Sequence, residues 1–248
     1  MRLKDKVTIV TGSACGIGKA IAMRFAREGS AVVINYTKSQ IEADETMREL
    51  SQIGSDALLV QADISRETEA QSLIDQTVKR YGGVDILINN AGITQAVKLT
   101  DLDGLTEAMW DNLFAVNVKG AFFCARAAAQ HIKHRGGGAI INITSAAAFT
   151  GRGSSIAYVT CKAALVSLTR SLSIALAPDI RVNAIAPGFV PTRWHAEHES
   201  WHSGIIRETP LGRLGHPEDI ASLALALVTD AGFVTGQTII CDGGITYR

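Results

Sequence analysis

The sequence predicts a doubly wound α/β fold, with one mostly parallel sheet of seven strands and helices on both faces. Three observations lead to this prediction. Short β-branched runs alternate with longer segments of helical periodicity, several of these runs are apolar on both faces, and 47% of the 248 residues are hydrophobic while 19% are charged. This composition is ample for one large core and excludes a chain that is disordered as a whole.

The alternation assigns each element in chain order. We expect strands at residues 6–11, 31–35, 57–62, 84–89, 138–144, 180–186 and 238–241. We expect helices at residues 16–28, 40–53, 66–81, 105–134, 155–177 and 217–229. Because no linker rich in proline or serine interrupts the alternation, we expect one domain over residues 1–248, with the polar segment at about 191–210 as a flap on it.

Charge and cysteine content narrow the function. Lysine plus arginine and aspartate plus glutamate both number 24, so the net charge is zero. Without a positive field, neither nucleic acid nor an anionic membrane surface is an expected partner. The four cysteines lie far apart in the sequence. The first apolar run ends at Thr11 and Gly12, so it is too short for a signal peptide or a membrane span. We therefore expect a cytoplasmic protein with reduced thiols.

A glycine-rich turn, Thr11 to Gly18, follows the first expected strand and leads directly into a helical pattern. This order forms a phosphate cradle, because unpaired backbone N–H groups and the helix dipole point at one place. Gly18 and Lys19 fit the end of a Walker A loop, but Ser13 replaces its first glycine and Ala20 its hydroxyl. The spacing G-x-x-x-G-x-G also differs from the usual dinucleotide fingerprint. By itself, the turn is compatible with nucleotide binding and with a purely structural role.

Tyr158 and Lys162 are four residues apart in an expected helix, so their side chains share one face. A free phenol has a pKa of about 10 and is a poor base at neutral pH, but an adjacent ammonium stabilises the phenolate. We therefore expect Lys162 to lower the pKa of Tyr158, and the pair to act as an acid or a base near neutral pH. An isolated pair of this kind is more often an ordinary surface contact.

Three further features accompany this pair and the glycine turn. They are Asn89-Asn90-Ala91-Gly92 at a strand end, Asn117 in a helix, and Ser145 after another strand. Together these features resemble the short-chain dehydrogenase/reductases, in the same order and on the same elements, over essentially the whole chain. The resemblance implies a Rossmann fold and an NAD(P)-dependent oxidoreductase that transfers hydride between a nicotinamide cofactor and a ketone or secondary alcohol.

The resemblance also implies catalytic roles. Tyr158 would exchange a proton with the substrate oxygen, and Ser145 would orient that oxygen. Lys162 would lower the pKa of Tyr158 and bind the nicotinamide ribose, while Asn117 would hold a water for proton relay. No metal takes part in this chemistry.

A cofactor surface follows from the same resemblance. It comprises the pyrophosphate turn, the end of the second strand, a carboxylate for the adenine, a segment along the adenine ribose and a loop for the carboxamide. These are Gly12, Ser13, Cys15, Gly16, Ile17 and Gly18; Asn35, Tyr36, Thr37 and Lys38; Asp63 and Ile64; Asn90, Ala91 and Gly92; and Pro187, Gly188, Val190 and Thr192, together with Tyr158 and Lys162.

The end of the second strand indicates which cofactor is used. An NAD enzyme usually carries Asp or Glu about 20 residues past the turn, where it bonds the ribose hydroxyls and repels a 2′-phosphate. Asn35 stands at that place, and Thr37, Lys38 and Ser39 follow it. Because a carboxylate is absent and a cation is near, the sequence favours NADP over NAD.

Three histidines in the flap, His195, His198 and His202, have spacings that would place them on one face of a helix. A zinc site is one interpretation. A polar lid over the substrate is the other, and the resemblance favours it because catalysis in this family needs no metal.

Within the family the chain looks most like the 3-oxoacyl-carrier-protein reductases and the secondary-alcohol and sugar dehydrogenases around them. A carrier protein needs a basic patch beside the active site; Lys133, His134 and Arg135 supply part of one, but Ala177-Pro178-Asp179 adds no cation. A sugar or other secondary-alcohol dehydrogenase using NAD, and a non-catalytic dinucleotide-binding sensor, are the alternatives. The long helices and the last strand predict a homotetramer or homodimer.

Overall fold

The computed structural model describes residues 1–192 and 199–247. Its strands form one parallel sheet in the order β3-β2-β1-β4-β5-β6-β7. The strands are β1 (Val7–Val10), β2 (Ala31–Tyr36), β3 (Ala57–Gln61), β4 (Ile86–Asn89), β5 (Gly138–Ile143), β6 (Ile180–Pro187) and β7 (Thr238–Cys241). The predicted doubly wound sheet of seven strands is confirmed.

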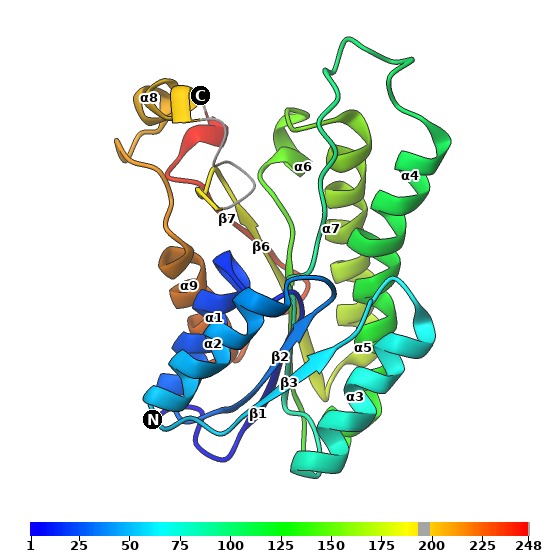
Figure 1. Ribbon diagram of the computed structural model, residues 1–248, viewed down its shortest axis with the longest axis vertical. Coiled ribbons are helices and arrows are strands. Elements are labelled where there is room, and N and C mark those ends of the chain that lie inside the picture. Colours follow the sequence, from blue (N-terminus) through cyan, green and yellow to red (C-terminus); the bar gives the residue numbers. More distant parts are fainter. Residues whose placement is uncertain (193–198, 248) are drawn as a thin grey trace.

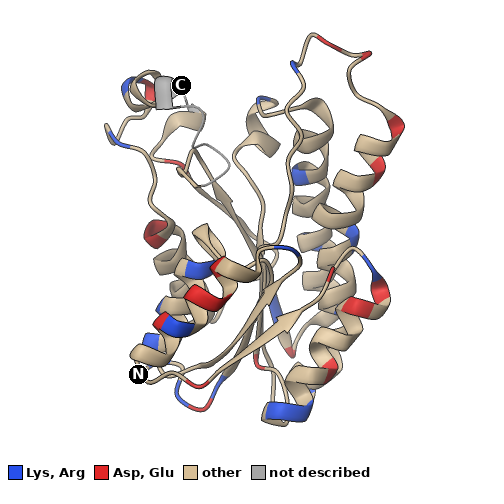
Figure 2. Cartoon of the chain, viewed as in Figure 1, with Lys and Arg blue, Asp and Glu red and all other residues tan. Residues whose placement is uncertain are grey.

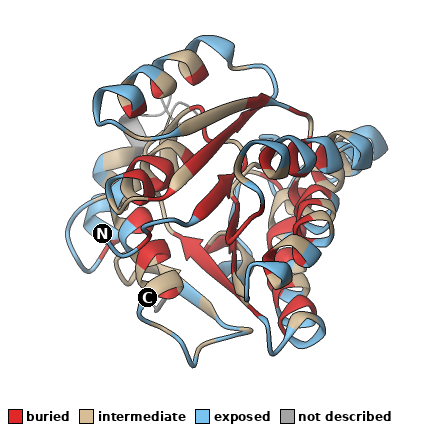
Figure 3. Cartoon of the chain, turned by 90° about the horizontal axis from the view of Figure 1, so that it is seen from below, coloured by how far each residue is buried: buried red, intermediate tan, exposed pale blue. Residues whose placement is uncertain are grey.

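Helices cover both faces of the sheet (Figure 1). One face carries α1 (Gly16–Arg27), α2 (Gln40–Gln52) and α9 (Pro217–Thr229), and the other carries α3 (Glu67–Tyr81), α5 (Ala121–His134) and α7 (Ile156–Leu176). Each face has its own apolar cluster, with Phe25 and Leu225 in one and Leu73 and Ile132 in the other. The central strands are buried, and the helices expose only their outer sides (Figure 3). Along α1, α2 and α3 these outer sides carry charges of both signs (Figure 2).

The helix predicted at 105–134 is present as helical backbone over residues 107–134, but it is not α-helical throughout. It consists of α4 (Glu107–Phe114), a π-helical stretch (Ala115–Gly120) and α5. A wider turn of this kind leaves the apolar periodicity on either side intact, so the sequence pattern does not reveal it. The structure also contains three short elements that the sequence analysis missed, namely α6 (Ala147–Thr150), α8 (Glu199–Glu208) and a 3₁₀ turn (Ile245–Tyr247).

Among the described residues, α7 is the helix whose length and composition would allow it to cross a membrane. It packs along β6 and contributes the buried residues Cys161, Leu165 and Lys162. Its apolar composition is therefore that of a core helix.

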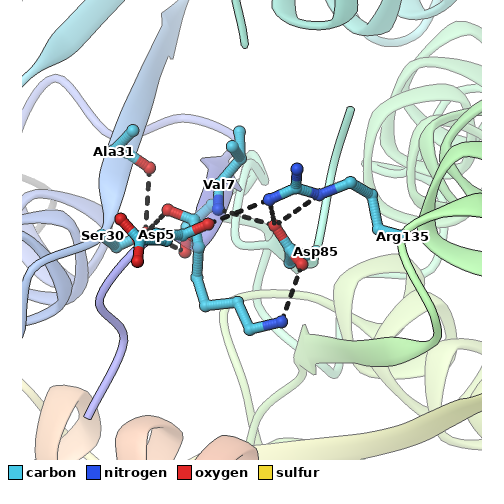
Figure 4. Close-up of polar contacts among 8 residues, drawn as sticks. Asp5, Val7, Ser30, Ala31, Asp85 and Arg135 are labelled. Atoms are coloured by element: carbon cyan, nitrogen blue, oxygen red, sulfur yellow. Dashed lines mark hydrogen bonds and ion pairs between the residues drawn. The ribbon is translucent and has the colours of Figure 1, made fainter. Parts of the chain in front are cut away.

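One buried carboxylate holds together the edge of the sheet at which the strands begin (Figure 4). Asp85 is 1% exposed and accepts a hydrogen bond from Val7 N at 2.9 Å. It also pairs with Lys6 Nζ and Arg135 Nη2, both at 3.0 Å, and the same Arg135 nitrogen donates to Asp5 O at 2.9 Å. Asp85 thereby connects the starts of β1 and β4 to the end of α5.

We expect Asp85→Ala to lower the free energy of unfolding by about 2 kcal/mol, because it leaves Val7 N and two cations without their acceptor. The loss stays below that of a fully buried pair because both cationic partners reach solvent. Urea denaturation measures it. Asp230→Ala is the matched control: Asp230 pairs with Arg2 at 2.7 Å but is 60% exposed, so its loss should be below about 0.5 kcal/mol. Equal losses in the two variants would contradict the assignment.

Candidate active site

The turn between β1 and α1 has no room for a side chain at Gly12 or Gly18. A Cβ at Gly18 would lie 2.5 Å from Asn90 Nδ2 and 2.6 Å from Gly12 O. Gly12 itself has a φ of 60°, in the left-handed region, where a Cβ would lie 2.7 Å from Ala91 Cα. The first turn of α1 carries no acidic residue. Backbone N–H groups at the start of a helix, free of large side chains and of negative charge, fit a pyrophosphate.

Thr11 and Asn90 tie this turn to the end of β4. Thr11 Oγ1 accepts hydrogen bonds from Asn90 N and Ala91 N, both at 3.0 Å. Asn90 Nδ2 donates to Thr11 O at 3.0 Å and to Gly12 O at 2.9 Å. Thr11 was not among the expected site residues, although a hydroxyl residue directly before the first glycine of the turn was a readable signal.

Asn35 was expected on the cofactor surface, but its side chain is buried and turned inward. Asn35 is 1% exposed, and its Oδ1 accepts from Gly12 N at 3.1 Å. Its Nδ2 donates to Ala62 O at 3.0 Å and to Val60 O at 3.3 Å. The residue braces the turn from inside because β2 extends through Tyr36, one residue further than expected. Thr37 is the first exposed side chain past the strand, and Lys38 follows it, also exposed.

The end of β3 carries the expected carboxylate. Asp63 Oδ1 accepts from Ser65 N at 3.0 Å and from Ser65 Oγ at 2.7 Å, so its position is set by the next turn. Ile64 is buried beneath Gly120 of the π-helical stretch, where a Cβ would lie 2.8 Å from Ile64 Cδ1. The two residues therefore have separate places, Asp63 half-buried and Ile64 in the core.

The loop after β6 meets the glycine turn. Gly188 N donates to Cys241 O at 3.0 Å, and Val190 is buried. A Cβ at Gly16 would lie 3.3 Å from Thr192 Cγ2. Segments about 175 residues apart in the chain thus lie side by side, and the carboxamide contact expected of Pro187 to Thr192 stays a prediction.

The four expected catalytic residues converge where β4 and β5 end. Ser145 follows β5, and Tyr158 and Lys162 lie in the first two turns of α7. A Cβ at Gly92 would lie 2.8 Å from Asn117 Oδ1 and 3.4 Å from Lys162 Nζ. Lys162 Nζ is 5.8 Å from the centre of the Tyr158 ring, and Tyr158 hydrogen-bonds with Ser145. The structure therefore brings together the residues that the sequence singled out.

Asn117 holds the segment after β4 through both of its side-chain polar atoms. Its Oδ1 accepts from Ile93 N and its Nδ2 donates to Ile93 O, both at 3.0 Å. Asn117 is 1% exposed and lies in the π-helical stretch. These two bonds fix the orientation of the Asn117 side chain and tie it to the segment after β4.

The electrostatics differ from the sequence expectation. Burial raises the pKa of Tyr158, and the hydrogen bond with Ser145 only partly offsets that rise. Lys162 is 4% exposed and donates from Nζ to Ile143 O at 3.0 Å. Burial lowers the pKa of Lys162 to about 8. The net shift of the Tyr158 pKa is therefore upward, opposite to the expected direction, because burial of the phenol has the largest effect on it.

The flap residues are described only in part. His195 and His198 lie outside the described residues. The ring of His202, in α8, packs edge-on against Phe189 with 5.5 Å between ring centres, and its Nε2 is buried. Over residues 1–192 and 199–247, no group of three or more His, Cys, Asp or Glu side chains is arranged to hold a metal ion.

Comparison with known proteins finds a matching family model and similar enzymes. Residues 12–246 match the family model described as enoyl-(acyl carrier protein) reductase. The chain is 40% identical over 247 residues to (2S)-[(R)-hydroxy(phenyl)methyl]succinyl-CoA dehydrogenase subunit BbsD of Thauera aromatica, covering 98% of each chain. It is 35% identical over 244 residues to 3-oxoacyl-[acyl-carrier-protein] reductase FabG of Staphylococcus epidermidis, covering 97% of this chain and 99% of the relative.

Solved structures agree with the sequence matches. A Serratia marcescens short-chain dehydrogenase/reductase superimposes with a TM-score of 0.92 at 33% identity, covering 99% of this chain and 100% of that one. The chain belongs to the short-chain dehydrogenase/reductase family. A gluconate 5-dehydrogenase from Burkholderia cenocepacia, in complex with NADP and tartrate, superimposes with a TM-score of 0.91 at 32% identity, covering 100% and 97% of the two chains.

For this short-chain dehydrogenase/reductase, membership of the family confirms the oxidoreductase class that the sequence predicted. Enzymes of the family interconvert alcohols and ketones with NAD(P), and solved relatives hold NADP.

Asn35→Asp distinguishes a buried brace from a ribose contact. We expect the variant to lose about 2 kcal/mol or more of unfolding free energy, because a carboxylate would face Val60 O and Ala62 O and lose both donated bonds. Urea denaturation measures the loss. Lys38→Asp, at the next exposed position, is the control and should unfold within about 0.5 kcal/mol of the parent. A stable Asn35→Asp protein that prefers NAD would refute the buried placement.

Proposed function

We propose that this enzyme interconverts a ketone and a secondary alcohol, with Tyr158 as the group that exchanges the proton. The observation that carries the proposal is the convergence of Tyr158, Ser145, Lys162 and Asn117 beside a glycine turn shaped for a pyrophosphate. When bound, the nicotinamide cofactor supplies or accepts the hydride. The 248 residues act as one domain, since all seven strands join one sheet.

The protonation state of Tyr158 suits an acid. Because burial raises the pKa of Tyr158, the phenol keeps its proton at neutral pH and can donate it to a carbonyl oxygen. Ser145 Oγ accepts a hydrogen bond from Ala147 N at 3.2 Å, which leaves its own proton to donate. A donor held in this way orients the same carbonyl oxygen and stabilises the charge that develops on it.

Lys162 and Asn117 lie beside the segment that follows β4. The Lys162 ammonium is anchored by Ile143 O and lies beside Gly92, where it can meet ribose hydroxyls. Its pKa of about 8 means that the side chain loses its positive charge as pH rises through that value. Asn117 positions Ile93, and a water held by Asn117 would link Lys162 to solvent as a proton relay.

Tyr158→Phe tests the proton-transfer role. Removing the hydroxyl should lower kcat for carbonyl reduction by about 100-fold or more, because general-acid groups contribute about that much. The dissociation constant for NADPH, measured by fluorescence titration, should change little, since the ring and Lys162 are kept. Full activity in this variant would contradict the assigned role.

NADP is the cofactor that we propose, with NAD as the alternative. The first exposed residues after β2 are Thr37 and Lys38, and no carboxylate stands between Asn35 and Ser39. A hydroxyl and an ammonium can bind a 2′-phosphate, whereas a carboxylate would repel it. Two further features support the proposal. The half-buried carboxylate of Asp63 can accept a hydrogen bond from the adenine, and a solved relative holds NADP.

Thr37→Asp should reverse this preference. A carboxylate at the exposed strand end would repel the 2′-phosphate and accept hydrogen bonds from ribose hydroxyls. We expect kcat/KM for NADPH to fall by about tenfold or more relative to that for NADH. Steady-state kinetics with both cofactors measure the ratio, and Thr37→Asn, which keeps the size without the charge, is the control. An unchanged ratio would place cofactor selection elsewhere.

For the substrate we propose a 3-oxoacyl thioester, with a sugar or other secondary alcohol as the second candidate. The expected basic patch does not lie beside the site, because α5 runs antiparallel to the strands and ends at their amino-terminal edge. There Lys133 pairs with Asp179 at 3.3 Å, and Arg135 pairs with Asp85. These cations do not favour an acyl carrier protein as partner. Assays with 3-oxoacyl-CoA, 3-oxoacyl carrier protein and sugar acids, each with NADPH, separate the candidates.

The proposed assembly is a homotetramer or homodimer in the cytoplasm. Large apolar side chains are exposed on separate elements: Phe122 on α5, Ile174 on α7 and Phe233 after α9. Contacts between subunits through α5 and α7 would cover the first two of these side chains. Cys124, Cys161 and Cys241 carry free thiols, which fits a reducing compartment. Light scattering of the purified protein measures the assembly.

A further inference from the structure

The segment before α7 packs directly against the ring of Tyr158. A Cβ at Gly153 would lie 2.9 Å from Val159 Cγ2 and 3.4 Å from both Tyr158 Cδ1 and Ala147 Cβ. Gly153 is not among the glycines with positive φ, so the space beside Val159, and not the backbone conformation, favours a residue without a side chain at this position. Ala147 follows Ser145 by two residues. The missing side chain of Gly153 therefore lets the phenol approach the region around Ser145.

The next residue connects this segment to the other half of the site. Ser154 O accepts a hydrogen bond from Val97 N at 2.8 Å, and the hydroxyls of Ser154 and Thr94 are hydrogen-bonded to each other. Thr94 follows Ile93, whose backbone is held on both sides by Asn117. A short series of contacts therefore joins Asn117 to the residues that precede Tyr158.

We propose that Gly153 and Ser154 are positioning residues for proton transfer by Tyr158. Gly153 sets how closely the ring approaches Ala147, and Ser154 ties the start of α7 to the segment that Asn117 holds. Proton transfer requires heavy atoms within about 3 Å of each other, and a displacement of about 1 Å can lower a rate by about 100-fold. The inference rests on the proposed role of Tyr158 and adds the residues that place it.

Gly153→Ala is the first test. We expect kcat to fall by about tenfold or more, because the new methyl group displaces the first turn of α7. The KM and the dissociation constant for NADPH should stay within about twofold, since the cofactor cradle is untouched. Gly232→Ala is the matched control: a Cβ there meets no atom within 4 Å, so kcat should not change. Gly153→Ala combined with Val159→Ala removes the closest clash and should recover most of kcat.

The hydroxyl pair gives a second, independent test. Ser154→Ala and Thr94→Ala should each lower kcat by about threefold, and the double variant should lower it no further, because both changes remove one hydrogen bond. Ser154→Thr keeps the hydroxyl and should retain most of the activity that Ser154→Ala loses. Additive losses, or losses confined to the KM for NADPH, would overturn the role of Ser154. A normal kcat in Gly153→Ala would overturn the role of Gly153.

A readout without turnover separates this inference from the proposed function. Spectrophotometric titration of the tyrosines, with Tyr158→Phe to assign the phenol, reports the environment of Tyr158 in the cofactor-free protein. In Gly153→Ala the pKa of Tyr158 should differ from that of the parent, because the added methyl group changes the packing around the ring. A wild-type protein that reduces no carbonyl compound would overturn the proposed function. An unchanged titration in Gly153→Ala would overturn the positioning role.

Discussion

The parallel pairing of β1 with β2 on one side and β4 on the other is the constraint on which the rest of the structure depends. It brings the carboxyl ends of these strands to one edge of the sheet, and chain order reverses at this point. The glycine turn after β1, the exposed residues after β2 and the segment after β4 therefore meet there. Continuing the sheet through β5 and β6 adds Ser145 and the loop that reaches Thr192.

The site also depends on the close approach of backbone segments. Gly12 and Gly18 leave room for the strand end that carries Asn90, Gly92 leaves room for Asn117, and Gly153 leaves room for the Tyr158 ring. Polar side chains then hold these approaches in place from within, Asn35 and Thr11 around the turn and Asn117 around Ile93. The reacting groups are thus set by contacts among segments that are distant in sequence, as a preorganised site requires.

Burial changes the chemistry that the residue types alone imply. On a solvent-exposed helix, an ammonium one turn from a phenol favours the phenolate. Here Lys162 is almost fully buried and bound to Ile143 O, and the surroundings of Tyr158 disfavour its charged form. The phenol therefore stays protonated at neutral pH, beside a lysine that is still mostly charged there because its pKa is about 8. In this form Tyr158 can donate its proton to a carbonyl oxygen.

The sequence by itself determined the fold class, the order of its elements and the residues that would gather at the site. It could do so because strand and helix periods are local, and because carboxyl ends of parallel strands share an edge. Only the tertiary structure showed that Asn35 faces inward, that a π-helical stretch interrupts the helix around Asn117, and that Lys133 and Arg135 lie at the opposite edge from Ser145. These features depend on where a strand ends, on contacts between distant segments and on burial, none of which a local sequence pattern contains.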